Sequence, residues 1–259
     1  MSSKNTILSQ REAELLENLI AKKGLFVSFE QIAGELGSSM NRQKVRNLVS
    51  KLARNGWLVR IKKGLYYITT LESRGSFNIS EFVIAQFIAK DSYISFYSAL
   101  QYHGMFDQYL SAVTSVSLKK ILRKEIQGIK FEFITTGRDD FYGWKEFNIE
   151  GFSVKIAFAE KALLDILNFK RTVHSVDVVL EKIKDHKEDL DIARLNEFSK
   201  GQTVTVKRIL GFLLDLAGVD SRSLQEMVKG ESGSSYMTGD SKNFNAKWRL
   251  YYHDHFDQA

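Results

Sequence analysis

The sequence predicts an α+β protein, in which an N-terminal winged helix-turn-helix precedes a larger mixed α/β domain with a helical C-terminal part. Residues 1–70 contain helix-capping signals, a basic segment with helical periodicity and a hairpin pattern. Strand patterns then dominate to about residue 158, and helical periodicity follows to about residue 229. We therefore predict a winged-helix domain over 1–70, a linker over 71–78 and an α+β second domain over 79–259, which closes with a loop and a last strand.

The first two helices of the winged helix are each predicted by a capping box followed by a terminating glycine. In a capping box, a side chain at the helix start and one three residues later satisfy each other's backbone N–H groups. The residues that carry these signals are Ser9, Glu12 and Gly24 for the first helix, and Ser28, Gln31 and Gly37 for the second.

A third helix is predicted from about Ser39 to Asn55, after the tight turn Gly37-Ser38-Ser39. Its apolar positions recur at helical spacing and form a narrow stripe that would face a core. They are Val45, Leu48, Val49 and Leu52. Two β-prone runs, 57–61 and 65–68, follow around a glycine-containing turn, which predicts a hairpin with lysines at its tip.

Charge separates the two predicted domains. Residues 1–70 hold 12 Lys/Arg and 5 Asp/Glu, a net charge of +7, whereas residues 71–259 hold 25 and 26, a net charge of −1. The segment 38–64 has eight basic residues and no acid. A basic balance confined to one segment is typical of a nucleic-acid-binding module.

Amide and guanidinium groups can read base edges in the major groove, and lysines more often hold phosphates. A solvated basic helix beside an ordinary hairpin is the simpler interpretation, and RNA is an alternative ligand. The combination of helices, turn and basic-tipped hairpin favours DNA. The predicted DNA-binding residues are Arg42, Gln43, Lys44, Arg46, Asn47 and Lys51 on the helix, and Arg60, Lys62 and Lys63 on the hairpin.

The second domain is predicted to alternate helices and strands before it becomes helical. The expected helices are 80–90, 98–103, 160–169, 175–184, 190–198, 204–216 and 221–228. The expected strands are 93–96, 113–118, 129–135, a hairpin over 147–158 that turns at Glu150-Gly151, and a last strand over 247–253. Residues 230–246 are rich in Gly, Ser and Asn and are predicted to be a loop.

Several residue groups could suggest chemistry but have simpler interpretations. For Glu160, Lys161 and Asp165 we favour capping and surface pairing over a catalytic cluster, because the two carboxylates lie about 140° apart on a helix. The His253-Asp254-His255 run lacks a third ligand, so a surface tail is favoured over a metal site. His103 is expected to be a packed or capping histidine rather than a general base, and Gly233-Ser234 with Asp240 falls short of a nucleotidyltransferase pattern.

A second basic cluster consists of Lys119, Lys120, Arg123 and Lys124. A solvated face is the favoured interpretation. An extension of the DNA contact, or a surface for a partner protein or its nucleic-acid substrate, remains open. The chain has no cysteine, which excludes disulfides, thiolate metal sites and cysteine nucleophiles, and no apolar run long enough for a membrane span. We therefore expect a cytoplasmic protein.

A series of short motifs resembles the antitoxins of AbiE-type abortive-infection (type IV) toxin–antitoxin systems. The likeness runs from about Leu8 to about Leu167, with Ala159 where the family often has proline. The motifs are Lys63-Gly64-Leu65-Tyr66-Tyr67-Ile68, Tyr93-Ile94-Ser95, Ser98-Ala99-Leu100, His103-Gly104 and Glu160-Lys161-Ala162-Leu163-Leu164-Asp165.

The resemblance implies a non-enzymatic autorepressor of phage-defence operons that needs no cofactor or metal. It implies that the first domain binds double-stranded operator DNA at inverted repeats, and that the second counters a nucleotidyltransferase toxin. Two alternatives remain: a stand-alone regulator that responds to a ligand or protein, and a DNA-targeted nuclease.

Overall fold

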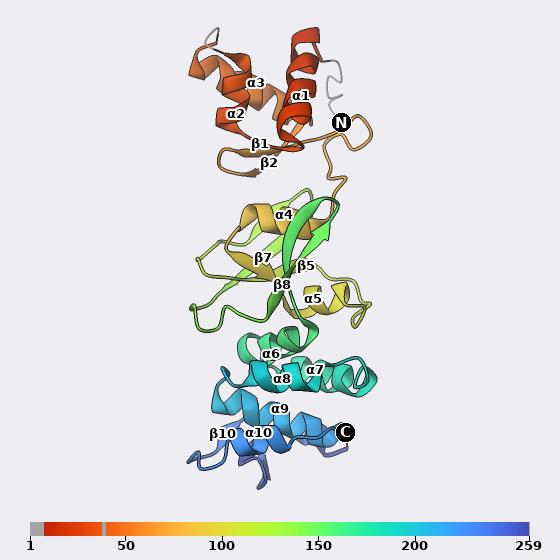
Figure 1. Ribbon diagram of the computed structural model, residues 1–259, viewed down its shortest axis with the longest axis vertical. Helices are drawn as coiled ribbons and strands as arrows, with labels where there is room; N and C mark the ends of the chain where they lie inside the picture. Colours follow the sequence, from red (N-terminus) through yellow and green to blue (C-terminus); the bar gives the residue numbers. More distant parts are fainter. Residues whose placement is uncertain (1–7, 38–39, 259) are drawn as a thin grey trace. The chain divides into compact units, whose positions relative to one another are not determined.

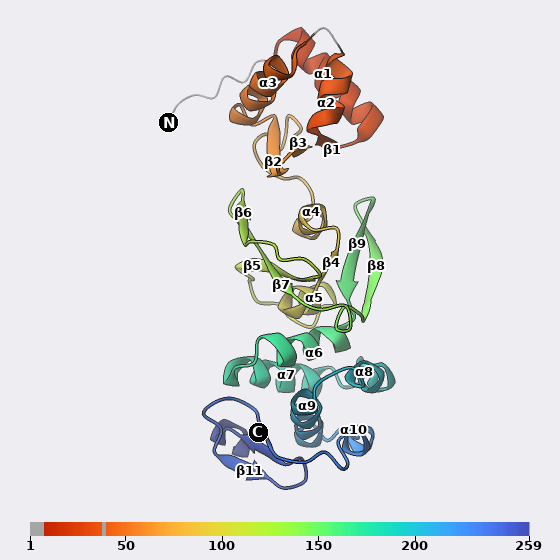
Figure 2. The same cartoon turned by 90° about the vertical axis from the view of Figure 1, so that its left-hand side faces the viewer.

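The computed structural model describes residues 8–37 and 40–258 (Figures 1 and 2). The chain divides into two compact units, one of residues 1–90 with 125–129, and one of residues 91–124 with 130–259. The predicted α+β class is confirmed, with a winged helix followed by a larger mixed domain that becomes helical. The short strand β6 (Lys124–Ile126) falls at the boundary between the units.

The first unit begins with three helices, α1 (Gln10–Lys23), α2 (Phe29–Leu36) and α3 (Arg42–Arg54). Both predicted capping boxes are present, and the two predicted glycines follow the helix ends. α3 begins three residues after its predicted start, because the side chain of Asn41 caps it by accepting the backbone N–H of Lys44 at 2.9 Å. The predicted turn at Gly37-Ser38-Ser39 lies partly outside the described residues.

The predicted hairpin is formed by β2 (Leu58–Lys62) and β3 (Leu65–Ile68). Gly64 turns the chain with a φ of +76°, a conformation that glycine adopts without strain. A third strand that we did not predict, β1 (Phe26–Ser28), pairs antiparallel with β3 and completes the sheet order β1-β3-β2.

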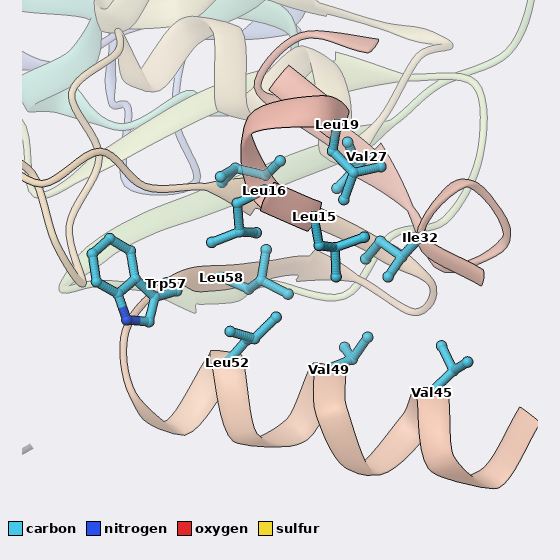
Figure 3. Close-up of a cluster of buried hydrophobic side chains, with 11 residues drawn as sticks. Leu15, Leu16, Leu19, Val27, Ile32, Val45, Val49, Leu52, Trp57 and Leu58 are labelled. Atoms are coloured by element: carbon cyan, nitrogen blue, oxygen red, sulfur yellow. The ribbon is translucent and has the colours of Figure 1, made fainter. Parts of the chain in front are cut away.

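A single apolar core joins these elements (Figure 3). Val45, Val49 and Leu52 point inward from α3, as the predicted stripe requires. They meet leucines of α1 and side chains of α2, β1, β2 and the residue before β2, all nearly or fully buried. The labelled partners are Leu15, Leu16, Leu19, Val27, Ile32, Trp57 and Leu58.

A fourth helix, α4 (Glu81–Ile88), belongs to the same unit. The ring of Phe87 stacks on that of Phe26 at a centroid distance of 3.6 Å, and the ammonium of Lys62 donates to the carbonyl oxygen of Ile88 at 3.2 Å. Residues 71–78, between β3 and α4, form turns without helix or strand.

The second unit contains a mixed sheet, and α5 (Phe96–Tyr102) connects two of its strands, β4 and β5, along the chain. The strand order is β7-β5-β4-β9-β8, in which β5 with β7 and β4 with β9 are parallel. The hairpin of β8 and β9 turns at Glu150 and Gly151, both at positive φ, as predicted. The bounds are β4 (Ser92–Ile94), β5 (Ala112–Ser117), β7 (Ile129–Thr135), β8 (Trp144–Ile149) and β9 (Phe152–Ala157).

Five helices follow, each within a few residues of its predicted range. They are α6 (Ala159–Phe169), α7 (Val173–Asp185), α8 (Ile192–Ser199), α9 (Val204–Leu216) and α10 (Arg222–Met227).

The chain ends in a three-stranded sheet of order β10-β12-β11, followed by a 3-10 helix, η1 (Asp254–Gln258). The predicted loop over 230–246 is therefore wrong in part, because it contains β10 (Ser235–Tyr236) and β11 (Asn243–Asn245). Strands of two or three residues are too short to show a period. The predicted last strand is present as β12 (Leu250–Tyr252).

Candidate nucleic-acid interface

The outward face of α3 is polar and exposed along its length. Val45, Val49 and Leu52 face the core, so the helical period turns the remaining positions to solvent. The exposed polar side chains are Arg42, Gln43, Lys44, Arg46, Asn47, Ser50, Lys51 and Arg54. No acidic residue lies on α3, so this face carries only positive formal charge.

At the centre of this face, the amide of Gln43 donates to the side-chain oxygen of Asn47 at 3.1 Å. The bond fixes two amides one helical turn apart, next to the exposed guanidinium of Arg46. Within the described residues, Lys44, Arg46 and Arg54 have no acidic partner at ion-pair distance, so their charges are available to a ligand.

Arg42 is held at the start of α3 by two residues of α2. Its guanidinium forms an ion pair with the Glu30 carboxylate and lies 5.5 Å from the centre of the Phe29 ring. The pair is exposed on both sides, so its contribution to stability is small. Its effect is to restrict where the guanidinium can point.

Lys51 is held by Glu12 of α1, whose carboxylate lies 2.8 Å from the ammonium. The Glu12 side chain is only 7% exposed and also accepts the backbone N–H of Ser9 at 2.9 Å. Burial acts to raise the pKa of Glu12, but hydrogen bonds from Lys51 and Ser9 outweigh it, so the pKa lies below its usual value.

The two lysines of the hairpin are in different environments. Lys63 is exposed at the tip, and Arg60 is exposed on β2. Lys62 is half-buried and donates to the Ile88 carbonyl, so it is directed toward α4. The structure thus brings Arg42, Gln43, Lys44, Arg46, Asn47 and Lys51 onto one helical face and gives Lys62 a different environment from Lys63.

Sequence reasoning did not identify the residues that hold two of these cations, Glu12 and Glu30. They lie 39 and 12 residues from their partners and belong to other helices. Sequence spacing carries no signal for such pairs.

The second basic cluster lies in the other unit, between the end of β5 and the first residue of β6. Lys119, Lys120 and Arg123 are exposed, and Lys124 is half-buried. Two of the four charges are partly offset, because Lys119 lies 2.7 Å from Asp91 and Arg123 lies 3.4 Å from Glu132.

The expected surface pairing around Glu160, Lys161 and Asp165 is wrong, because all three side chains are buried. Lys161 and Asp165 form a fully buried ion pair, and the Asp165 carboxylate also accepts hydroxyl bonds from Ser95 at 2.6 Å and Tyr93 at 3.1 Å. Glu160 faces elsewhere and accepts the backbone N–H of Asp191 at 2.8 Å. The two carboxylates thus have separate partners, and α6 is amphipathic only in part.

The histidines have structural contacts. His103 lies 2.8 Å from the carbonyl oxygen of Ala157, and His255 lies 2.9 Å from the Asp177 carboxylate. His253 lies 2.7 Å from Asp254. In the part of the chain that the structure describes, no group of three His, Cys, Asp or Glu residues could hold a metal ion. No helix among the described residues is long and apolar enough to cross a membrane.

Comparison with known proteins bears on both units. The family described as "Transcriptional regulator, AbiEi antitoxin" matches residues 14–69, which cover most of α1 and extend through β3. The crystal structure of the RV2827C protein from Mycobacterium tuberculosis is similar, with a TM-score of 0.68 at 14% identity over 95% of this chain and 92% of that chain. At this identity the likeness shows a shared fold. No curated protein sequence matches the chain.

The first unit thus combines a winged helix, a basic outward face and a sequence match to a family of transcriptional regulators. The match to the AbiEi antitoxin family confirms the predicted resemblance over residues 14–69.

Proposed function

We propose that the protein is a non-enzymatic antitoxin and transcriptional autorepressor. Its winged helix binds inverted repeats in the double-stranded DNA of its own operator, and its second domain counters a nucleotidyltransferase toxin. The observation that carries the DNA-binding part is the outward face of α3, which presents paired amides and unpaired guanidinium groups without one acidic residue.

Arg46, Gln43 and Asn47 are assigned to base edges in the major groove. Guanidinium and amide groups form the bidentate contacts that distinguish base pairs there. The bond between Gln43 and Asn47 limits the rotamers of both amides, which lowers the entropy lost on binding.

The remaining cations are assigned to phosphates, which set affinity and salt dependence rather than sequence preference. Arg42 and Lys51 are positioned by acids of neighbouring helices, and Arg60 and Lys63 belong to the hairpin. Lys62 is the weakest member of the predicted set, because it is directed toward Ile88.

We assign DNA binding to the domain of residues 1–70 and the antitoxin role to the domain of residues 79–259. Residues 71–78 are assigned as the linker between them. The family match supports the antitoxin role, since its description names an antitoxin as well as a regulator. The protein is expected to act in the cytoplasm, in abortive infection as a phage defence, without a cofactor.

DNA binding is tested by fluorescence anisotropy with the promoter region of the gene. The double variant R46A/N47A should lose discrimination between promoter and unrelated duplex, by about 5- to 150-fold for one bidentate contact. Lys23→Ala removes an exposed cation at the far end of α1 and is the control. Unchanged promoter affinity in R46A/N47A would refute the assignment of α3.

The antitoxin role is tested by co-expression with the neighbouring toxin gene. The intact protein should restore growth, and R46A/N47A should restore it equally when both genes are driven from foreign promoters. Failure of the intact protein to restore growth would contradict the antitoxin role and leave the DNA-binding assignment standing.

A further inference from the structure

Three aromatic rings form a continuous row across the C-terminal sheet. Tyr236 of β10 pairs in register with Tyr251 of β12, which pairs with Phe244 of β11. The rings of Tyr236 and Tyr251 stack at 4.5 Å with an interplanar angle of 11°, and those of Phe244 and Tyr251 lie 4.9 Å apart. We call these three residues the aromatic row.

The aromatic row is open to solvent at both ends. Tyr236 is 53% exposed and Phe244 is 49% exposed, so a ligand can reach both rings. The intervening positions of the sheet face inward, since Leu250 and Met237 are fully buried and Tyr252 contacts the ring of Phe212 at 4.8 Å. The row is therefore held on a sheet that is anchored from its other side.

Positive charge lies beside the aromatic row. Lys242, two residues before Phe244, is exposed, and so is Arg249, two residues before Tyr251. Arg249 also lines a neighbouring cavity of about 470 Å³, together with Lys229 and Lys247. The acids Glu226 and Glu231 line the same cavity. The three strands themselves carry no carboxylate, although Asp257 accepts hydrogen bonds from Asn243 and Tyr252, and Asp240 interacts with Lys242.

We propose that the aromatic row binds single-stranded nucleic acid. Bases would extend the stack at Tyr236 and Phe244, and phosphates would be held by Arg249 and Lys242. Stacking of bases on aromatic rings, with cations along the backbone, is how single strands are bound without sequence preference. A duplex keeps its bases inside its own stack, so this surface would select single strands.

The test uses the full chain and a fluorescein-labelled single strand of about 12 nucleotides, as RNA and as DNA, in an anisotropy titration. Tyr236→Ala and Phe244→Ala should each weaken binding by about 5- to 100-fold, the effect of losing one base–ring stack. Tyr236→Phe keeps the ring and should bind like the parent. Tyr109→Ala removes a tyrosine that is 91% exposed elsewhere in the same unit and should leave binding unchanged.

A second variant separates this surface from the winged helix. R46A/N47A should bind the single strand like the parent protein, and ultraviolet crosslinks should map to Tyr236 or Phe244. Whether the RNA or the DNA strand binds more tightly identifies the natural source of the ligand.

Two results would overturn the proposal. One is that the parent protein fails to bind either strand, or that Tyr236→Ala and Phe244→Ala bind as it does. The other is that these variants lose toxin neutralisation but keep full affinity for the strands, which would make the aromatic row a protein-docking surface.

Discussion

The carboxylate of Glu12 and the ammonium of Lys51 lie 2.8 Å apart, although 39 residues separate them in the chain. Glu12 belongs to the capping box of α1, and Lys51 lies on the exposed face of α3. One buried side chain therefore stabilises a helix start and also positions a cation that we assign to DNA.

Glu12→Gln keeps the shape of the side chain and removes its charge. Gln serves the same capping position in α2, so the variant should keep the cap and lose the ion pair. We expect the free energy of unfolding to fall by about 0.5–2 kcal/mol, the range for charge-assisted bonds that are partly solvated. Urea titration measures this, and Glu17→Gln, an exposed change on the same helix, should have no effect.

The difference in the free energy of unfolding between Glu12→Gln and the parent protein should depend on pH. The folded-state pKa of Glu12 is lowered, so its contribution is complete above the unfolded value of 4.5 and is lost as pH falls through the folded pKa. Urea titrations at pH 7 and at pH 3 should show a smaller difference at pH 3. An equal difference at both values would show that Glu12 does not stabilise the fold through its charge.

Lys62 and Lys63 are neighbours that should differ in DNA binding. Lys63→Ala should weaken binding to any duplex and reduce the slope of log affinity against log salt by about one, as expected for one phosphate contact. Lys62→Ala should change the slope less, because its ammonium is bonded to Ile88. Equal slopes for the two variants would contradict the different roles of these lysines.

The buried pair of Lys161 and Asp165 predicts a non-additive effect on stability. Lys161→Met leaves a fully buried carboxylate without its cation and should cost about 3–5 kcal/mol. K161M/D165N should cost less than the sum of its single changes, since Asn can still bond to Ser95 and Tyr93. Calorimetric unfolding of the four proteins gives the coupling energy, and additive losses would refute the pairing.

Burial raises the pKa of Asp165, and Lys161, Ser95 and Tyr93 offset part of this effect. Lys161→Met removes the ammonium group, which does most to lower the pKa of Asp165. A carboxyl group with a raised folded pKa loses stability as pH rises above its unfolded value. The variant should therefore be least stable at neutral pH and recover part of the difference near pH 4, whereas no recovery would indicate that the loss comes from packing.

Gly211 of α9 lies against the fully buried indole of Trp248. A Cβ added at Gly211 would come within 2.2 Å of a ring carbon. Gly211→Ala should therefore cost about 1–3 kcal/mol through overpacking, although alanine is the better helix former. Thermal unfolding followed by circular dichroism measures the loss. Gly34→Ala in α2, where the added carbon meets no atom within 4 Å, is the matched control and should be neutral or stabilising.

Local signals in the sequence predicted most of the fold. The capping boxes at Ser9 and Ser28 each depend on two residues that are three positions apart. The apolar stripe of α3 depends on positions within one helix. Both patterns could therefore be recognised in the sequence. β1, β6, β10 and β11 were missed because strands of two or three residues have no measurable period.

The candidate site was predictable in its residue types but not in its contacts. The outward residues of α3 follow from the inward ones by helical geometry. That Glu12 holds Lys51, that Lys62 turns toward Ile88, and that Lys161 is buried rather than exposed all depend on elements far away in the chain. The charge of Lys161 led us to predict that it lies at the surface, because a lysine is rarely buried without a paired acid.

The stacking of Phe87 on Phe26 has a consequence for how the winged-helix domain could be inherited. Phe26 is 8% exposed, and it belongs to the wing sheet, whereas Phe87 comes from α4, beyond the last residue of the family match. A gene fusion that transferred only residues 8–69 would expose the ring of Phe26 to solvent and would remove the Ile88 carbonyl to which Lys62 donates. A transfer that continues to Lys90 would carry both, so recombination should favour the longer piece as the unit that moves between proteins.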